Sequence, residues 1–234
     1  MKRLYVITAL LLVLFTTPAV AQEESKASFD LGVDLVSSYV WRGAYQTSAA
    51  IQPGMGLSVG GFSLSAWASV PFSGEGKEVD FALGYQVGGF SIGITDYWWA
   101  GEGAYEYFEY KSHKTAHHFE AALGYTLPAE KFPLALSWST MFAGEDYYKG
   151  DGKRAYSTYI SAAYPFQIKS ISLEAEAGIT PWEGMYANEF SVVSVGLKAS
   201  KEIQITNKFS VPVFGQVIAN PKAQDIFFVF GISL

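Results

Sequence analysis

Three histidines and a glutamate lie close together and are the first candidates for metal or catalytic chemistry. They are His113, His117, His118 and Glu120, and they include every histidine of the chain. In an extended strand His118 and Glu120 share one face while His117 points to the other, so the three side chains cannot converge on one ion. We therefore expect surface histidines and no metal site or cofactor.

Hydrolysis of lipid is a second chemistry to consider. A lipid hydrolase built on a barrel would need a serine and a histidine on adjacent strands that face lipid, together with an oxyanion donor. His117 could face lipid, but the residue pattern supplies no evident serine partner. We expect that the protein is not an enzyme.

Charged side chains recur at every second position of several segments, and this spacing places them on one face of a strand. Either they line a wet pore, biased towards cations or polar neutral solutes, or they pair across a narrow lumen and fill it. The residues predicted to line the lumen are Asp30, Asp34, Arg42, Glu78, Asp80, His118, Glu120, Glu174, Glu176 and Lys198.

Two predicted loops, about 97–114 and 181–189, are rich in aromatic side chains. Such side chains could bind a sugar face or a partner, or they could anchor the loops at a membrane interface, where aromatic enrichment is usual. The candidate loop contacts are Trp98, Trp99, Tyr105, Trp182 and Tyr186.

The elements that must position these residues are strands. From Phe29 to Leu234, segments of about ten residues alternate apolar with small or polar side chains and end in turns, as in transmembrane β-barrels. In the first segment Phe29, Leu31 and Val33 share one face, and Asp30 and Asp34 share the other. Carboxylates are costly in lipid, so the polar face must point inward. We predict an all-β, antiparallel transmembrane β-barrel of about 12 strands, with roughly 10 or 14 as bounds.

Connection lengths orient this barrel. Short turns such as Gly60-Gly61 and Gly88-Gly89 alternate with longer loops, about 43–49, 71–77, 97–114, 143–153, 181–189 and 220–225. Barrels of this kind keep short turns on the periplasmic side. Aromatic residues should form a belt at each end. Those assigned to the loop end are Tyr39, Trp41, Trp67, Tyr97, Trp98, Trp138, Phe142 and Tyr156; those assigned to the turn end are Phe62, Tyr85, Phe90, Tyr125, Phe132, Tyr164 and Phe209.

Residues 1–21 have the pattern of a secretory signal peptide. Lys2 and Arg3 precede an apolar run, and Ala19-Val20-Ala21 is a small-x-small cleavage site. The mature domain would then be 22–234, and losing these two positive charges lowers the net charge from −6 to −8. An acidic chain without a basic tract is a poor candidate for nucleic acid, and the lack of cysteine excludes disulfides and a lipid anchor.

The segment Val36-Ser37-Ser38-Tyr39-Val40-Trp41-Arg42-Gly43 resembles the opening motif of the TorF-like porin family of Gram-negative bacteria. The resemblance continues loosely through Ala66-Trp67-Ala68-Ser69 and the C-terminal 220–232. It departs at Ala44-Tyr45, where that family usually has Ser-Gln, and at the terminal Leu234 in place of phenylalanine. The resemblance implies an outer-membrane porin whose substrate is unassigned.

Together these patterns predict an outer-membrane channel for passive diffusion of small polar solutes or cations, in contact with outer-membrane lipid and in an unknown oligomeric state. The alternative is a non-conducting barrel that presents aromatic loops for adhesion or partner binding. A soluble lipocalin-like barrel, with its apolar face inside, is a third interpretation.

Overall fold

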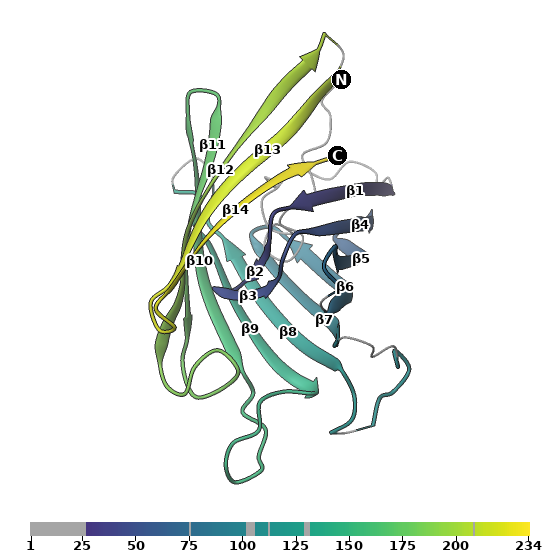
Figure 1. Ribbon diagram of the computed structural model, residues 1–234, viewed down its shortest axis with the longest axis vertical. Coiled ribbons are helices and arrows are strands. Elements are labelled where there is room, and N and C mark those ends of the chain that lie inside the picture. Colours follow the sequence, from purple (N-terminus) through teal and green to yellow (C-terminus); the bar gives the residue numbers. More distant parts are fainter. Residues whose placement is uncertain (1–26, 75, 102–105, 112, 129–131, 208) are drawn as a thin grey trace.

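The chain folds into a closed antiparallel β-barrel, seen in a computed structural model (Figure 1). The structure describes residues 27–234 except 75, 102–105, 112, 129–131 and 208. The predicted signal peptide, its cleavage site and Tyr105 therefore lie outside the described residues. No helix in the described part of the chain is long and apolar enough to cross a membrane.

Twelve strands form the barrel within these residues, and two more form a separate small sheet. The barrel strands are β1 (Ser28–Val36), β4 (Ala50–Val59), β5 (Phe62–Pro71), β6 (Lys77–Val87), β7 (Phe90–Ala100), β8 (His117–Thr126), β9 (Ala135–Gly144), β10 (Thr158–Ile168), β11 (Ile171–Thr180), β12 (Ser191–Thr206), β13 (Phe209–Asn220) and β14 (Asp225–Ser233). The small sheet pairs β2 (Tyr39–Trp41) with β3 (Ala44–Thr47). The all-β class and the count of twelve predicted from the alternation are confirmed.

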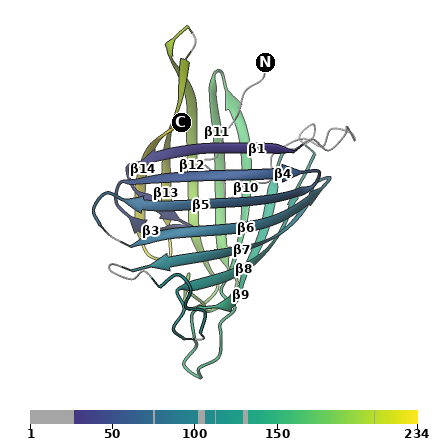
Figure 2. The ribbon, with the colours of Figure 1, turned by 90° about the vertical axis from the view of Figure 1, so that its right-hand side faces the viewer.

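Each barrel strand pairs with its neighbours in the chain, and β1 closes the ring by pairing with both β14 and β4 (Figure 2). Gly60-Gly61 and Gly88-Gly89 form the tight turns expected of them. The registers are set by these short turns and by the alternation of the side chains, since a slip of one residue would exchange the two faces.

The apolar face of the barrel points outward, and this decides against the lipocalin-like interpretation. Phe29 is 66% exposed and Phe90 is 63% exposed, whereas inward Asp34 and Glu120 are each only 3% exposed. The outer surface carries large apolar side chains on strand after strand, among them Leu31, Leu57, Phe62, Leu64, Phe81, Leu83, Ile92, Ile94, Leu123, Leu136, Leu197 and Phe228.

The aromatic belt at the turn end is present on the outer surface as paired rings. Phe62 packs on Tyr85 with ring centroids 4.6 Å apart, and Phe90 packs on Tyr125 at 4.4 Å. At the loop end the expected belt is smaller. Trp138, Phe142 and Tyr156 are exposed, but four aromatic side chains assigned to that belt instead lie inside the barrel: Tyr39, Trp41, Trp67 and Tyr97.

Two predicted boundaries are wrong. Strand β7 continues to Ala100, so the aromatic loop predicted from residue 97 begins later. Residues 43–49, predicted as an external loop, instead contain β3, which pairs with β2 in a hairpin. Figures 1 and 2 place this hairpin within the outline of the barrel. The short alternation Tyr39-Val40-Trp41 was too brief to be separated from the end of the first strand.

Candidate functional site in the barrel lumen

The β2–β3 hairpin turns at Arg42 and Gly43. Their φ angles are +50° and +79°, the pair of positive values that a type I′ two-residue turn requires. Glycine adopts this conformation freely, whereas a non-glycine residue such as Arg42 gives up about 1–3 kcal/mol to hold it. The arginine is therefore kept at the tip of the hairpin by contacts elsewhere.

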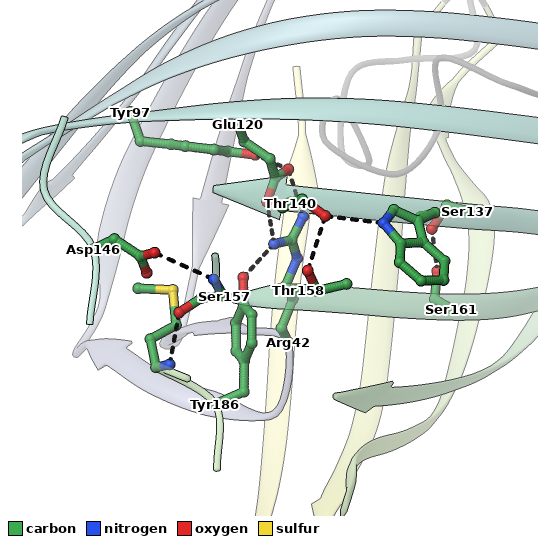
Figure 3. A network of polar contacts seen from close by, with 12 residues as sticks. Arg42, Tyr97, Glu120, Ser137, Thr140, Asp146, Ser157, Thr158, Ser161 and Tyr186 are labelled. Atoms are coloured by element: carbon green, nitrogen blue, oxygen red, sulfur yellow. Dashed lines mark hydrogen bonds and ion pairs between the residues drawn. The ribbon is translucent and has the colours of Figure 1, made fainter. Parts of the chain in front are cut away.

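Those contacts centre on Glu120 of β8 (Figure 3). Arg42 donates two parallel hydrogen bonds to this carboxylate, with N–O distances of 2.5 and 2.8 Å. It also donates to the hydroxyl of Tyr186, and Tyr97 donates its own hydroxyl to Glu120 over 3.1 Å. Bidentate arginine–carboxylate pairs are among the strongest hydrogen-bonded contacts in proteins, so Arg42 fixes the hairpin to the far wall.

Aromatic rings surround the guanidinium of Arg42. Its central carbon lies 4.3 Å from the ring centroid of Trp41, 4.8 Å from that of Tyr159 and 5.6 Å from that of Tyr186. Burial lowers the pKa of Arg42, but the carboxylate of Glu120 and its other neighbours raise it well above its usual range. Arg42 is therefore charged at any accessible pH.

Tyr186 is positioned by the loop between β11 and β12. The backbone N–H of Met185 donates to the hydroxyl of Ser157 at 2.8 Å, and the N–H of Ser157 donates to the Asp146 carboxylate at 3.2 Å (Figure 3). Burial raises the pKa of Tyr186 well above its usual value. Tyr186 therefore contributes a neutral hydroxyl, which accepts a hydrogen bond from Arg42.

Gly43 brings the hairpin against strands β12 and β13. A Cβ at this position would lie 1.9 Å from the carbonyl oxygen of Val193, which no side chain allows. The side-chain amide of Asn220 donates to the Gly43 carbonyl oxygen over 3.1 Å. The hairpin is thus held at opposite walls, by Arg42 on one side and by Gly43 on the other.

The rest of the loop half of the lumen is filled by packed aromatic side chains. Trp41 contacts the rings of Tyr97, Trp99 and Tyr186 at centroid distances of 5.6, 5.4 and 5.9 Å. Tyr39 packs edge-on against Trp67 at 5.4 Å. These contacts make the hairpin a plug within the barrel.

Exposure along the inward face rises from the loop end to the short-turn end. On β6, Glu78 and Asp80 are buried, whereas Ala82, Gly84 and Gln86 are half-buried. On β11, Thr180 and Gly178 are buried, Glu176 and Glu174 are half-buried, and Ser172 is exposed. The lumen therefore opens into a vestibule on the short-turn side and closes at the hairpin.

A cavity of about 150 Å³ lies directly under the hairpin. Charged residues on its walls include Asp34, Glu174, Glu176 and Lys198, with Arg42 at the hairpin. Glu176 accepts a hydrogen bond from the Tyr159 hydroxyl at 2.9 Å. Its other walls come from aromatic and aliphatic side chains and two amides: Tyr39, Trp41, Trp67, Phe214, Ile218, Val229, Gln52 and Gln216.

The predicted lumen residues thus fall into two groups and one outlier. Arg42, Glu78, Asp80, His118 and Glu120 lie in the closed loop half, although Arg42 comes from the hairpin tip and not from the wall. Asp34, Glu174, Glu176 and Lys198 line the cavity beneath the hairpin. Asp30 lies closer to the turn end of β1 and is half-buried. Cross-lumen pairing of charges, one of the two alternatives, is present between Arg42 and Glu120.

Two of the three histidines are buried, which corrects the expectation of surface residues. His117 has Nδ1 2.8 Å from the Asp96 carboxylate and Nε2 2.5 Å from the Tyr107 carbonyl oxygen, so neither nitrogen is available to a metal or a nucleophile. His118 points inward and packs on Trp99 at 4.0 Å, while His113 is exposed. In the described part of the chain, no group of three or more His, Cys, Asp or Glu side chains is placed to hold a metal ion.

Two segments of the sequence fit the letters Gly-x-Ser-x-Gly. They are Gly56-Leu57-Ser58-Val59-Gly60 and Gly89-Phe90-Ser91-Ile92-Gly93. In nucleophile elbows this pattern forms a strand-to-helix turn. Here the first segment lies at the end of β4 and leads into a hairpin, with Ser58 opposite Ser28 and Ser63 in the neighbouring strands. The second leads from a tight turn into β7, with Ser91 opposite Gln86 and Gly124. Both segments are therefore part of the barrel wall.

The predicted loop contacts are dispersed. Trp98 and Trp99 belong to β7: Trp98 is covered by Tyr107, and Trp99 faces the hairpin. Tyr186 is buried against Arg42, and Trp182 is 37% exposed beside Trp138. These aromatic side chains do not form one exposed surface. Tyr159 was not singled out from the sequence, Tyr97 was assigned to the aromatic belt, and Gly43 and Asn220 entered only through the family resemblance. The paired Arg-Gly after a short apolar alternation was the signal of the hairpin.

The comparisons with known proteins give a family and no function. No curated protein matches the chain. A family model described as "Bacterial protein of unknown function (Gcw_chp)" matches residues 20–211, which covers the hairpin, its partners Glu120 and Tyr186, and most of the barrel. The chain therefore belongs to the Gcw_chp family of bacterial proteins.

Proposed function

We propose that this protein is an outer-membrane channel for passive diffusion of small polar solutes or cations, constricted by the β2–β3 hairpin. The observation that carries the proposal is the polarity of the closed barrel, apolar outside and charged inside. Soluble monomers rarely expose apolar patches beyond a few hundred Å². Hydrocarbon tails would cover this outer surface, whereas the lumen needs water.

The short turns orient the barrel in the membrane. Turns such as Gly60-Gly61 belong on the periplasmic side, and the longer loops belong outside the cell. The vestibule and the cavity then face the periplasm, and the plug lies towards the outer surface. The mature N-terminus of an exported chain starts on the periplasmic side, in agreement with this orientation.

The lumen charges favour cations. Arg42 is engaged by Glu120, and the cavity below it carries Asp34, Glu174 and Glu176 against Lys198. Rings of carboxylates attract cations and repel anions in pores. Solutes would pass when the hairpin shifts away from the wall. This passage involves no chemical transformation, so we propose transport and no enzymatic activity.

The second candidate function is a closed barrel that presents its loops to partners. Its supporting observation is the packing of the plug, where Tyr97 is 1% exposed and Met141 is 0% exposed. An interior filled in this way would not conduct without a rearrangement.

Planar-bilayer recordings of the refolded mature protein test the proposal. We expect small, infrequent conductance steps whose reversal potential in a KCl gradient indicates cation preference. Liposome swelling should show uptake of small sugars with a size limit. Anion preference would contradict the proposed lumen, and complete absence of conductance and swelling in a folded sample would favour the closed barrel.

A further inference from the structure

The cavity under the hairpin combines carboxylates with an apolar surface. The carboxylates are those of Glu174 and Glu176 on β11 and of Asp34 on β1. Strands β13 and β14 lie between β11 and β1 in the barrel, and they contribute the apolar side chains of Phe214, Ile218 and Val229. A ligand that contacts both the carboxylates of β11 and this apolar surface has a positive charge at one end and an apolar body at the other.

Lys198 shows which kind of group the cavity accommodates. Its ammonium lies 4.5 Å from the ring centroid of Phe214, within the range of a cation–π contact. It stands directly across the β11–β12 pair from Glu174. Among the described residues, Arg42 forms an ion pair with Glu120, and none of the ion pairs within 4.0 Å includes Lys198. The chain thus places one alkylammonium of its own between an aromatic face and carboxylates.

Charge and size then limit the ligand. With Arg42 engaged by Glu120, the one ammonium of Lys198 faces the two carboxylates of Glu174 and Glu176, so the site favours a further positive charge. A cavity of about 150 Å³ can hold a molecule the size of benzene. On the inward face of β11, half-buried Glu174 is followed by exposed Ser172, so a slightly longer molecule can extend towards the short-turn end.

We propose that this cavity binds a small organic ammonium ion, with its charge at Glu174 and Glu176 and its apolar body against Phe214. As the solute class of a channel, the assignment rests on the proposed function, whereas binding itself does not require conduction. Since Tyr39, Trp41 and Arg42 form part of the cavity wall, an occupant contacts the hairpin directly and its binding is coupled to the position of the plug.

Benzylammonium and benzyl alcohol are the matched probes, since they have similar shape and differ in charge. Binding is measured by titration calorimetry on the full mature chain in detergent, with heats from empty micelles subtracted. The change in total tryptophan fluorescence, to which Trp41 and Trp67 at the cavity wall contribute, is a second readout. We expect benzylammonium to bind at least about tenfold more tightly than benzyl alcohol, as one charge-assisted contact provides.

Four variants test how the charges at the cavity affect benzylammonium binding. Glu174→Gln and Glu176→Gln should each weaken benzylammonium binding about tenfold, because each removes one negative charge. Lys198→Met should strengthen it several-fold, because it removes a competing ammonium. Glu202→Gln is the matched control on β12, since Glu202 is exposed beyond the cavity, and it should bind as the original protein does. A heat-dependent shift in electrophoretic mobility verifies that every variant is a folded barrel.

Equal binding of the two probes would overturn the proposal, as would Glu174→Gln and Glu176→Gln variants that bind as tightly as Glu202→Gln. Bilayer recordings separate this failure from failure of the channel. A protein that binds benzylammonium without conducting retains the site and loses the proposed function. One that conducts with no benzylammonium binding retains the channel and loses the site.

Discussion

The two halves of the lumen have the same strands and the same alternation, yet they differ in how deeply their side chains are buried and how closely these side chains are packed. Near the loops, Arg42 and Glu120 are 6% and 3% exposed at their side chains and are enclosed by aromatic rings. Near the short turns, the inward positions are small and half-buried, as with Ala82 and Gly84 on β6. The loop half is a packed protein core inside a barrel, and the short-turn half is a water-accessible vestibule.

The difference shows that the lumen of this twelve-stranded barrel is filled by side chains in one half and accessible to water in the other. Eight-stranded barrels are filled by their own wall side chains, and barrels of 16–18 strands leave an aqueous channel. Here the wall alone cannot fill the lumen, so a hairpin inserted between β1 and β4 fills one half. A movement of the hairpin would therefore open the loop half of the lumen.

Replacing the hairpin should have the largest effect on this comparison. A short Gly-Ser connection in place of Tyr39–Thr47 would leave the twelve strands paired and remove Trp41 and Arg42 from the lumen. We expect single-channel conductance to increase several-fold, since the loop half would then resemble the vestibule. Unchanged conductance in a folded variant would mean that the hairpin does not close the pore.

The ion pair between Arg42 and Glu120 gives the next largest effect. Glu120→Gln should destabilise the folded barrel by about 3–5 kcal/mol, because it leaves Arg42 buried without its counter-charge. Arg42→Met should cost about the same for the converse reason. The double variant should recover part of the loss, and urea unfolding in detergent, followed by tryptophan fluorescence, measures this coupling. Additive losses would indicate that the two residues do not interact.

The strands of the barrel wall could be predicted from the sequence, whereas the hairpin that plugs the lumen could not. Alternation in segments such as Phe29–Val36 reports which side of a strand meets water, so the strands and the outward apolar face could be predicted. The position of Arg42 depends on Glu120 and Tyr186, which are distant in the chain, and on the close approach of Gly43 to Val193. A local pattern carries no information about such contacts, so Tyr39 and Trp41 resembled a belt.

Gly43→Ala tests the opposite attachment of the hairpin, with a smaller effect. The added methyl would meet the Val193 carbonyl oxygen, and the positive φ alone costs about 1–3 kcal/mol. Gly74→Ala is the control for backbone strain, since its φ is +81° and nothing lies within 4 Å of the new Cβ. We expect more frequent channel openings for Gly43→Ala and not for Gly74→Ala. Equal effects of both variants would assign the change to strain and not to docking.

The exposed ion pair between Lys222 and Glu189 should have the smallest effect. Its N–O distance is 2.7 Å, but the Glu189 side chain is 68% exposed. Exposed pairs are screened by water and salt and often contribute nothing measurable. Lys222→Met should therefore change neither the urea midpoint nor the conductance, and a loss comparable to Glu120→Gln would contradict the contrast between buried and exposed pairs.

Cysteine labelling compares the two halves most directly, because the chain contains no cysteine of its own. Ser63 and Ser69 share the inward face of β5, with Ser63 half-buried near the short turn and Ser69 1% exposed in the loop half, where it accepts a hydrogen bond from Gln52. In liposomes, Ser63→Cys should react readily with a small polar maleimide and Ser69→Cys should be protected until the hairpin is replaced. Equal reactivity of the two cysteines with the hairpin in place would contradict a lumen that is closed at one end and open at the other.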